Sequence, residues 1–136
     1  MKTKNILTLG LIIISVMTAC KKYPDGPLLS LKSRTARVAN VWKMEQVMLN
    51  GSIVTSNYTN INYTETYDKS GNYSYNSSIG SGSGKWTFAN KDTQIKRNGV
   101  SGQSSEDLTI LRLKEKSFWY KFTDGNDTYE FHLIPN

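Results

Sequence analysis

The chain has few of the residues that most often carry chemistry in proteins. It contains one cysteine and one histidine among 136 residues. A disulfide needs two cysteines, and an activated serine needs a base together with a residue that orients it. His132 follows Phe131 in an alternating segment, so an inward Phe131 would place His132 on the solvent face. The sequence therefore predicts no enzyme, no metal site and no cofactor.

The chain also lacks a hydrophobic run long enough for a membrane-spanning helix, which needs about 20 apolar residues. Its most apolar stretch runs from Ile6 to Met17 and is interrupted by Thr8, Gly10 and Ser15. Lys2 and Lys4 precede this stretch, and small residues follow it. A positive start, a short apolar core and small residues at its end are typical of a cleaved signal peptide, which we assign to residues 1–19.

Cys20 directly follows Met17-Thr18-Ala19. These four residues resemble the lipobox of bacterial lipoproteins, an aliphatic residue and two small ones before an invariant cysteine. The resemblance implies cleavage before Cys20, diacylglycerol on its sulfur and an acylated new N-terminus, and two or more acyl chains anchor a protein stably in a membrane. Lys21 and Lys22 stand where an inner-membrane lipoprotein tends to have aspartate, which favours the outer membrane and leaves the face open. The alternative is an ordinary secretory signal with a chance cysteine.

Positive charge is unevenly distributed along the chain. Residues 21–43 contain six basic side chains and one acidic side chain, whereas residues 44–136 contain nine basic and ten acidic ones. A nucleic-acid-binding domain would carry a basic stripe on a folded face, so we expect no nucleic-acid partner. We assign residues 20–34 to a lipidated tether, whose cations suit an anionic membrane surface or merely keep a linker solvated.

From Val41 onward, short segments rich in aromatic and β-branched residues alternate with turn signals, which predicts antiparallel strands. Asn50-Gly51 is a strong hairpin signal, and a return strand is expected at residues 53–57. The run Gly80-Ser81-Gly82-Ser83-Gly84 predicts a flexible loop or a sharp bend. A short helix is expected within residues 28–40. Because the strand-rich part from Val41 onward offers no helices to cover a sheet, we predict an all-β fold, an up-and-down antiparallel barrel of roughly eight strands over residues 35–136.

Several segments resemble the lipocalin-like domains of small Gram-negative lipoproteins. They are the strand that opens at Trp42 and ends in Asn50-Gly51, the segment from Tyr67 to Tyr73, the segment from Gly84 to Phe88, and the closing pair 110–113 with 129–133. The resemblance covers about residues 35–134 and implies an up-and-down barrel, but it assigns no particular activity.

Aromatic residues are the positive signal, since the chain contains eight Tyr, four Phe and three Trp. Alternation points about half of them inward, and the inward candidates include Phe118. The predicted ligand-binding residues are Trp42, Tyr67, Tyr73, Trp86, Tyr120 and Phe131. They would line a cup for a small apolar or amphipathic ligand. Alternatively, the rings fill the barrel and the protein is a non-catalytic interaction module, with an exposed patch around Tyr58, Tyr75 and Trp119.

Overall fold

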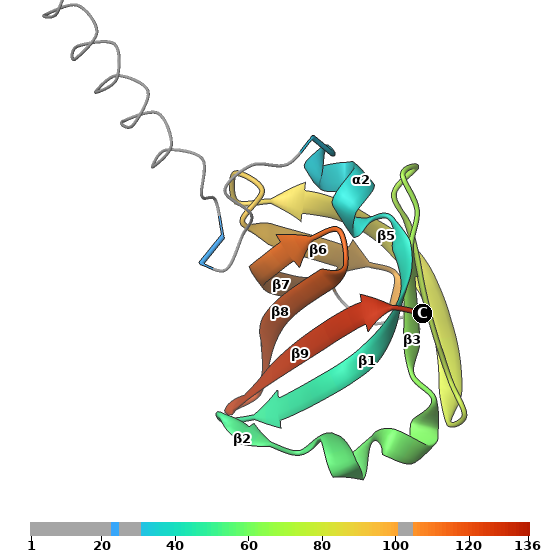
Figure 1. Ribbon diagram of the computed structural model, residues 1–136, viewed down its shortest axis with the longest axis vertical. Coiled ribbons are helices and arrows are strands. Elements are labelled where there is room, and N and C mark those ends of the chain that lie inside the picture. Colours follow the sequence, from blue (N-terminus) through green and yellow to red (C-terminus); the bar gives the residue numbers. More distant parts are fainter. Residues whose placement is uncertain (1–22, 25–30, 101–104) are drawn as a thin grey trace, which may run out of the picture.

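The structure is a closed antiparallel β-barrel of eight strands with a short helix at one end (Figure 1). The computed structural model describes residues 23–24, 31–100 and 105–136, so the predicted signal peptide and Cys20 lie outside the described residues. The elements are α2 (Arg34–Val38), β1 (Asn40–Leu49), β2 (Ser52–Ile53), β3 (Thr64–Tyr67), β4 (Asn72–Ser77), β5 (Gly80–Ala89), β6 (Gln94–Asn98), β7 (Glu106–Lys114), β8 (Ser117–Asp124) and β9 (Asp127–Pro135). The all-β barrel with a preceding helix is thus confirmed.

Strand β1 closes the barrel because it pairs along most of its length with β9, from Trp42 opposite Pro135 to Leu49 opposite Tyr129. Its other edge pairs with β3 at residues 40–43 and with the two-residue strand β2 at its far end. The turn between β1 and β2 has left-handed backbone angles at Asn50 and Gly51, with φ of 49° and 82°. That conformation matches the twist of a hairpin, as the Asn-Gly pair predicts.

The prediction of a return strand over residues 53–57 is wrong beyond Ile53. Strand β2 ends at Ile53, and two 3₁₀ turns follow at Thr55–Asn57 and Thr59–Ile61. The Thr55 hydroxyl accepts a hydrogen bond from Val47 N at 3.0 Å and donates to Val47 O at 3.4 Å. This side chain therefore takes the place of a strand partner, as Thr, Ser and Asn side chains commonly do when they compete with a backbone ladder.

The glycine-rich run is also not a loop, because Gly80 to Gly84 form the first half of β5. Gly82 and Gly84 lie directly opposite Tyr75 and Tyr73 of β4, where the absence of side chains leaves room for the tyrosine rings. At Gly84 a Cβ atom would stand 2.2 Å from the carbonyl oxygen of Asn98. Glycine here permits close approach of a neighbouring backbone, which is its usual role inside a strand.

Helix α2 closes one end of the barrel (Figure 1). Ser33 caps it by accepting a hydrogen bond from Ala36 N at 3.1 Å. Val38 is fully buried, and its carbonyl accepts a hydrogen bond from Trp42 Nε1 at 2.8 Å. Arg37 donates to the carbonyl of Leu113 at 2.9 Å, which ties the helix to β7. No helix among the described residues has the length and apolar composition to cross a membrane.

Candidate functional site

The interior of the barrel has two halves. In the closed half, below α2, aromatic rings pack against one another: Phe118 lies 5.8 Å from Trp42 and 5.7 Å from Tyr67 between ring centroids, and Trp86 lies 5.8 Å from Tyr67. Their exposed fractions do not exceed 6%. Because these rings also interlock with buried Leu113 and Leu133, the closed half is filled by side chains.

The six predicted ligand-binding residues all belong to or pack against the core, so their inward direction is confirmed, as is that of Phe118. Trp42, Tyr67, Tyr73, Trp86 and Tyr120 are buried, and only Phe131 is half-buried. None of the six lines the two openings in the barrel wall that are described below. That any of the six binds a ligand stays a prediction.

A buried carboxylate lies at the middle of the barrel. Glu65 of β3 has no solvent exposure, and four tyrosine hydroxyls donate to it. Its Oε1 accepts from Tyr63 and Tyr120 at 2.6 Å each and from Tyr73 at 3.5 Å, and its Oε2 accepts from Tyr67 at 2.8 Å. A buried charge is tolerated only when it is paired and hydrogen-bonded, and this one is both.

Arg97 of β6 supplies the pairing charge. Its Nη1 donates to Glu65 Oε1 at 3.0 Å and to the hydroxyl of Tyr73 at 2.7 Å. Its Nε donates to Glu106 Oε2 at 2.9 Å, and Nη2 also contacts that oxygen. The guanidinium carbon lies 4.6 Å from the centroid of the Tyr73 ring, within cation–π range. One cation therefore stands between two carboxylates, which gives the group a formal net charge of −1.

The buried environment shifts the pKa of the tyrosines and of Arg97. Burial, reinforced by the charge of Glu65, raises the pKa of Tyr63, Tyr67 and Tyr120 well above the ordinary value. Burial disfavours the charged guanidinium, but the fields of Tyr67 and Glu65 outweigh it and raise the pKa of Arg97. The phenols thus remain donors at neutral pH. Since Glu65 has both oxygens engaged, the arrangement is suited to joining β3, β4, β6 and β8 across the interior.

Sequence reasoning missed Glu65 and Arg97 as interior residues, although the signal was present. Glu65 alternates in phase with Tyr63 and Tyr67, and Arg97 stands two residues after the buried Ile95. In a strand, residues two apart share a face. Two opposite charges at inward positions predict a buried ion pair.

The opposite half of the interior, which we call the open half, contains five half-buried rings: Tyr63, Tyr75, Phe122, Tyr129 and Phe131. They form a continuous chain of ring contacts, with centroid distances between 5.4 and 6.2 Å. Such rings offer apolar faces that are already partly dehydrated, which suits an apolar or aromatic ligand.

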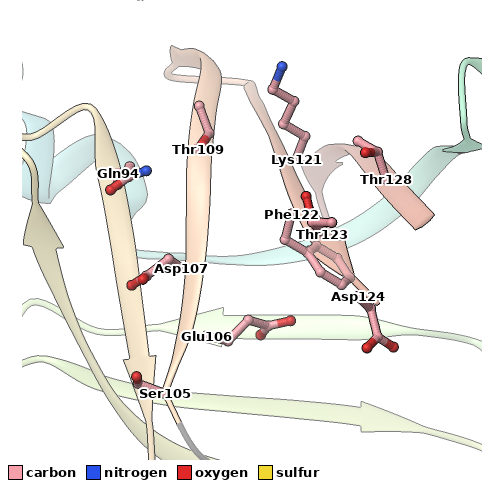
Figure 2. Close-up of a pocket in the computed structure, with 10 residues that line it drawn as sticks. All are labelled: Gln94, Ser105, Glu106, Asp107, Thr109, Lys121, Phe122, Thr123, Asp124 and Thr128. Atoms are coloured by element: carbon pink, nitrogen blue, oxygen red, sulfur yellow. The ribbon is translucent and has the colours of Figure 1, made fainter. Parts of the chain in front are cut away.

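An opening in the barrel wall leads toward this layer. The ladder between β7 and β8 ends where Thr109 pairs with Lys121. Beyond that point Glu106 of β7 and Phe122 of β8 pair with the strands on their other sides and not with each other's strand. A cavity of about 700 Å³ lies there. Figure 2 shows the Glu106 carboxylate directed from β7 toward the strand that carries Phe122 and Asp124. The opening thus places an aromatic ring beside carboxylates, one of which is paired with Arg97.

A second opening lies where β1 and β3 separate. Its volume is about 300 Å³, and Met44 and Tyr63 contribute interior side chains to its lining. Beyond the four pairs that join β1 to β3, Thr55 and Tyr58 of the 3₁₀ segment border the gap. Both openings therefore reach side chains of the open half, from different sides of the barrel.

On the outer wall, His132 stacks on Trp119, with ring centroids 3.9 Å apart, and its Nε2 lies 2.6 Å from Glu130 Oε1. The histidine does face outward, but its neighbours cover it to 9% exposure, so it is not a solvent-exposed residue.

Tyr75, expected in an exposed patch, faces the interior instead and stacks on Tyr63. Among the described residues, no three His, Cys, Asp or Glu side chains are placed to share a metal ion.

No protein-family model and no curated protein sequence matches this chain.

Proposed function

We propose that this protein is a lipid-anchored outer-membrane lipoprotein with a lipocalin-like barrel that binds a small apolar or amphipathic ligand in its open half. The anchor is argued from Met17-Thr18-Ala19-Cys20 and the signal peptide before it. The ligand site is carried by one observation: five half-buried rings form a layer that the 700 Å³ opening between β7 and β8 reaches. Ligand sites are typically apolar and aromatic with a few placed polar groups. The ring layer supplies the aromatic part, whereas the opening that leads to it has a mainly polar lining and contributes Phe122 from the layer.

The anchor is tested by intact mass measurement of the protein extracted from membranes. We expect the mass of residues 20–136 with thioether-linked diacylglycerol and an N-acyl chain. The Cys20→Ser variant should lack the acyl mass and leave the membrane fraction. A protein that is cleaved elsewhere and carries no lipid would refute the anchor.

Ligand binding is tested by native mass spectrometry of protein purified without detergent, and by titration with N-phenyl-1-naphthylamine, a neutral apolar probe. The expected result is probe fluorescence that Phe122→Ala weakens severalfold. Ile53→Ala is the matched control, because Ile53 is a 68% exposed apolar residue on β2 outside the barrel interior. Equal binding by both variants, with no co-purified molecule, would overturn the ligand site.

The filled closed half favours a second candidate function, a non-catalytic interaction module. The exposed apolar side chains of the barrel include Ile53 and Ile79, which are 68% and 80% exposed and lie near the open end. This module would use its outer surface and need no interior space. It predicts that a partner protein protects Ile53 and Ile79 from labelling while the Phe122→Ala variant binds that partner normally.

A further inference from the structure

Tyr23 ties the segment that follows Cys20 to the closed end of the barrel. Its side chain is 3% exposed, and its hydroxyl donates to the carbonyl oxygen of Asp92 at 3.0 Å. Asp92 lies in the turn between β5 and β6, and Arg34 of α2 contacts its carboxylate at 2.5 Å. The chain is therefore fixed to this end of the barrel only three residues after Cys20.

Three residues set a short limit on distance. A fully extended chain spans at most about 3.5 Å per residue, so the Tyr23 backbone lies within about 11 Å of the Cys20 backbone. If Cys20 carries acyl chains in the bilayer, as proposed above, then the Tyr23 contact keeps the closed end beside the lipid headgroups.

The charge of the closed end suits that position. Helix α2, the residues just before it, the turns at this end and the last residue of β7 carry seven basic side chains and three acidic ones, which gives a net charge of +4. The basic residues are Lys32, Arg34, Arg37, Lys69, Lys91, Lys114 and Lys116, and the acidic ones are Asp68, Asp92 and Glu115.

The opposite end has the reverse charge. Among the described residues, the turns there carry no lysine or arginine, and Glu106, Asp124 and Asp127 lie at the adjoining strand ends. An anionic bilayer therefore attracts the closed end and repels the open one. Leu31 adds an apolar contact, because it is fully exposed just before α2.

From these observations we infer that the closed end of the barrel, with α2 and the turns that contain Lys69, Lys91 and Lys116, is a docking surface for an anionic lipid bilayer. The open half then faces away from the membrane. This inference rests on the proposed lipid anchor, which supplies the membrane attachment at Cys20. It adds the orientation of the barrel and the chemistry of the lipid that holds it.

The experiment measures which end of the protein meets the bilayer. The full lipidated protein is reconstituted into phosphatidylethanolamine vesicles containing phosphatidylglycerol and brominated lipid, which quenches tryptophan on contact. Leu31→Trp places a probe at the closed end, and Ile79→Trp is the matched control, an 80% exposed position on the opposite end. We expect at least twofold stronger quenching at position 31. Equal quenching at both positions, or stronger quenching at position 79, would overturn the inference.

The electrostatic part has its own test. Each cation held near an anionic surface contributes about 1 kcal/mol, or about fivefold in the docking equilibrium. Neutralising Lys69, Lys91 and Lys116 to Gln should therefore lower the quenching of Leu31→Trp toward that of the control. Replacement of Lys96 and Lys121 on the outer wall should leave it unchanged. Quenching that does not depend on phosphatidylglycerol or on these lysines would refute an anionic-lipid surface.

The two proposals fail in distinguishable ways. Absence of the acyl mass on Cys20 would refute the lipid anchor, and the vesicle experiment is interpreted only on protein that carries that mass. Protein that is acylated but shows no preference for its closed end would refute the orientation alone. Tyr23→Ala should remove the contact that holds the closed end close to Cys20. It should therefore reduce the difference in quenching between the tryptophans at positions 31 and 79.

Discussion

At the scale of single residues, Glu65 is the most consequential side chain described. Burying a carboxylate is costly, and its attraction to Arg97 offsets that cost only when the remaining hydrogen bonds are satisfied. Four phenols from Tyr63, Tyr67, Tyr73 and Tyr120 meet this requirement. Loss of Arg97 would leave Glu65 buried without its cation, whereas loss of Glu65 would leave Arg97 paired with Glu106.

The first prediction concerns this pair. Glu65→Gln should lower the free energy of unfolding by about 3–5 kcal/mol, since it leaves Arg97 buried with less compensation. Glu65→Leu combined with Arg97→Met should recover only part of this loss, because it removes both buried charges but leaves buried tyrosine hydroxyls without their acceptor. Urea denaturation monitored by circular dichroism would measure both effects.

Lys96→Gln is a suitable control for the pair, because Lys96 and Asp107 form an exposed ion pair at 3.7 Å that we expect to contribute about 0–1 kcal/mol. If Glu65→Gln costs no more than this control, the interior network does not stabilise the barrel.

The second prediction follows from the buried phenols. Folding raises the pKa of Tyr63, Tyr67 and Tyr120, so above pH of about 10 the unfolded chain releases phenolic protons that the folded chain keeps. Their contribution is complete below that pH and is lost as the pH rises further. Tyrosinate absorbance should therefore show these residues ionising together with loss of the barrel's circular dichroism. Ionisation of all eight tyrosines near their ordinary pKa in a still-folded barrel would contradict this.

At the scale of elements, β5 shows that glycine can serve a strand as well as a turn. Gly84 lies opposite the ring of Tyr73 on one side and against the Asn98 carbonyl on the other. The backbone of β6 can approach there only because a side chain is absent. The first half of β5 is thus specified by its neighbours and not by its own propensity.

The third prediction tests this. Gly84→Ala should lower the free energy of unfolding by about 1–3 kcal/mol, because its Cβ would overlap a backbone oxygen that cannot easily move. Ser83→Ala, at an exposed position one residue away, is the control and should have little effect. Equal thermal midpoints for the two variants would show that the backbone of β6 can shift away from a Cβ atom at position 84 without loss of stability.

The same strand marks what the sequence could and could not predict. Strands such as β1 and β9 were predictable because alternation and Asn50-Gly51 are local signals. The strand at Gly80–Gly84 was not predictable, because its glycines are required by contacts with Tyr73, Tyr75 and Asn98. These residues lie on the neighbouring strands, and the sequence alone does not show that they pack against β5. The alternation of Glu65 with Tyr63 and Tyr67 predicts that its side chain points inward. That Arg97 is its partner becomes evident only from the structure, in which β3 and β6 face each other across the barrel interior.

At the scale of the whole molecule, the barrel has a densely packed end and a less packed one. Trp42, Phe118 and Leu133 are fully buried in the closed half, whereas the rings of the open half are half-buried. Local opening costs less free energy where fewer apolar contacts are lost. The open half should therefore open more often than the closed half.

The fourth prediction is a gradient of amide hydrogen exchange along the barrel axis. Ladder amides near Phe118 and Leu133 should exchange at rates limited by global unfolding, and those near Tyr75 and Ser81 should exchange faster through local opening. Mass spectrometry of peptides from the same strands would resolve the two groups. Uniform protection along β4 and β5 would instead indicate a single cooperative unit.

The pairing of β1 with β9, which closes the barrel, has a consequence for biosynthesis. Trp42 of β1 lies opposite Pro135 of β9, so the first strand of the barrel completes its pairing with the last. A chain made from its N-terminus keeps β1 with an unpaired edge until nearly all of the sequence has emerged, and such long-range pairing is slow to form. Secretion channels thread unfolded chains. For a protein exported as proposed, this topology would postpone folding until translocation is almost complete.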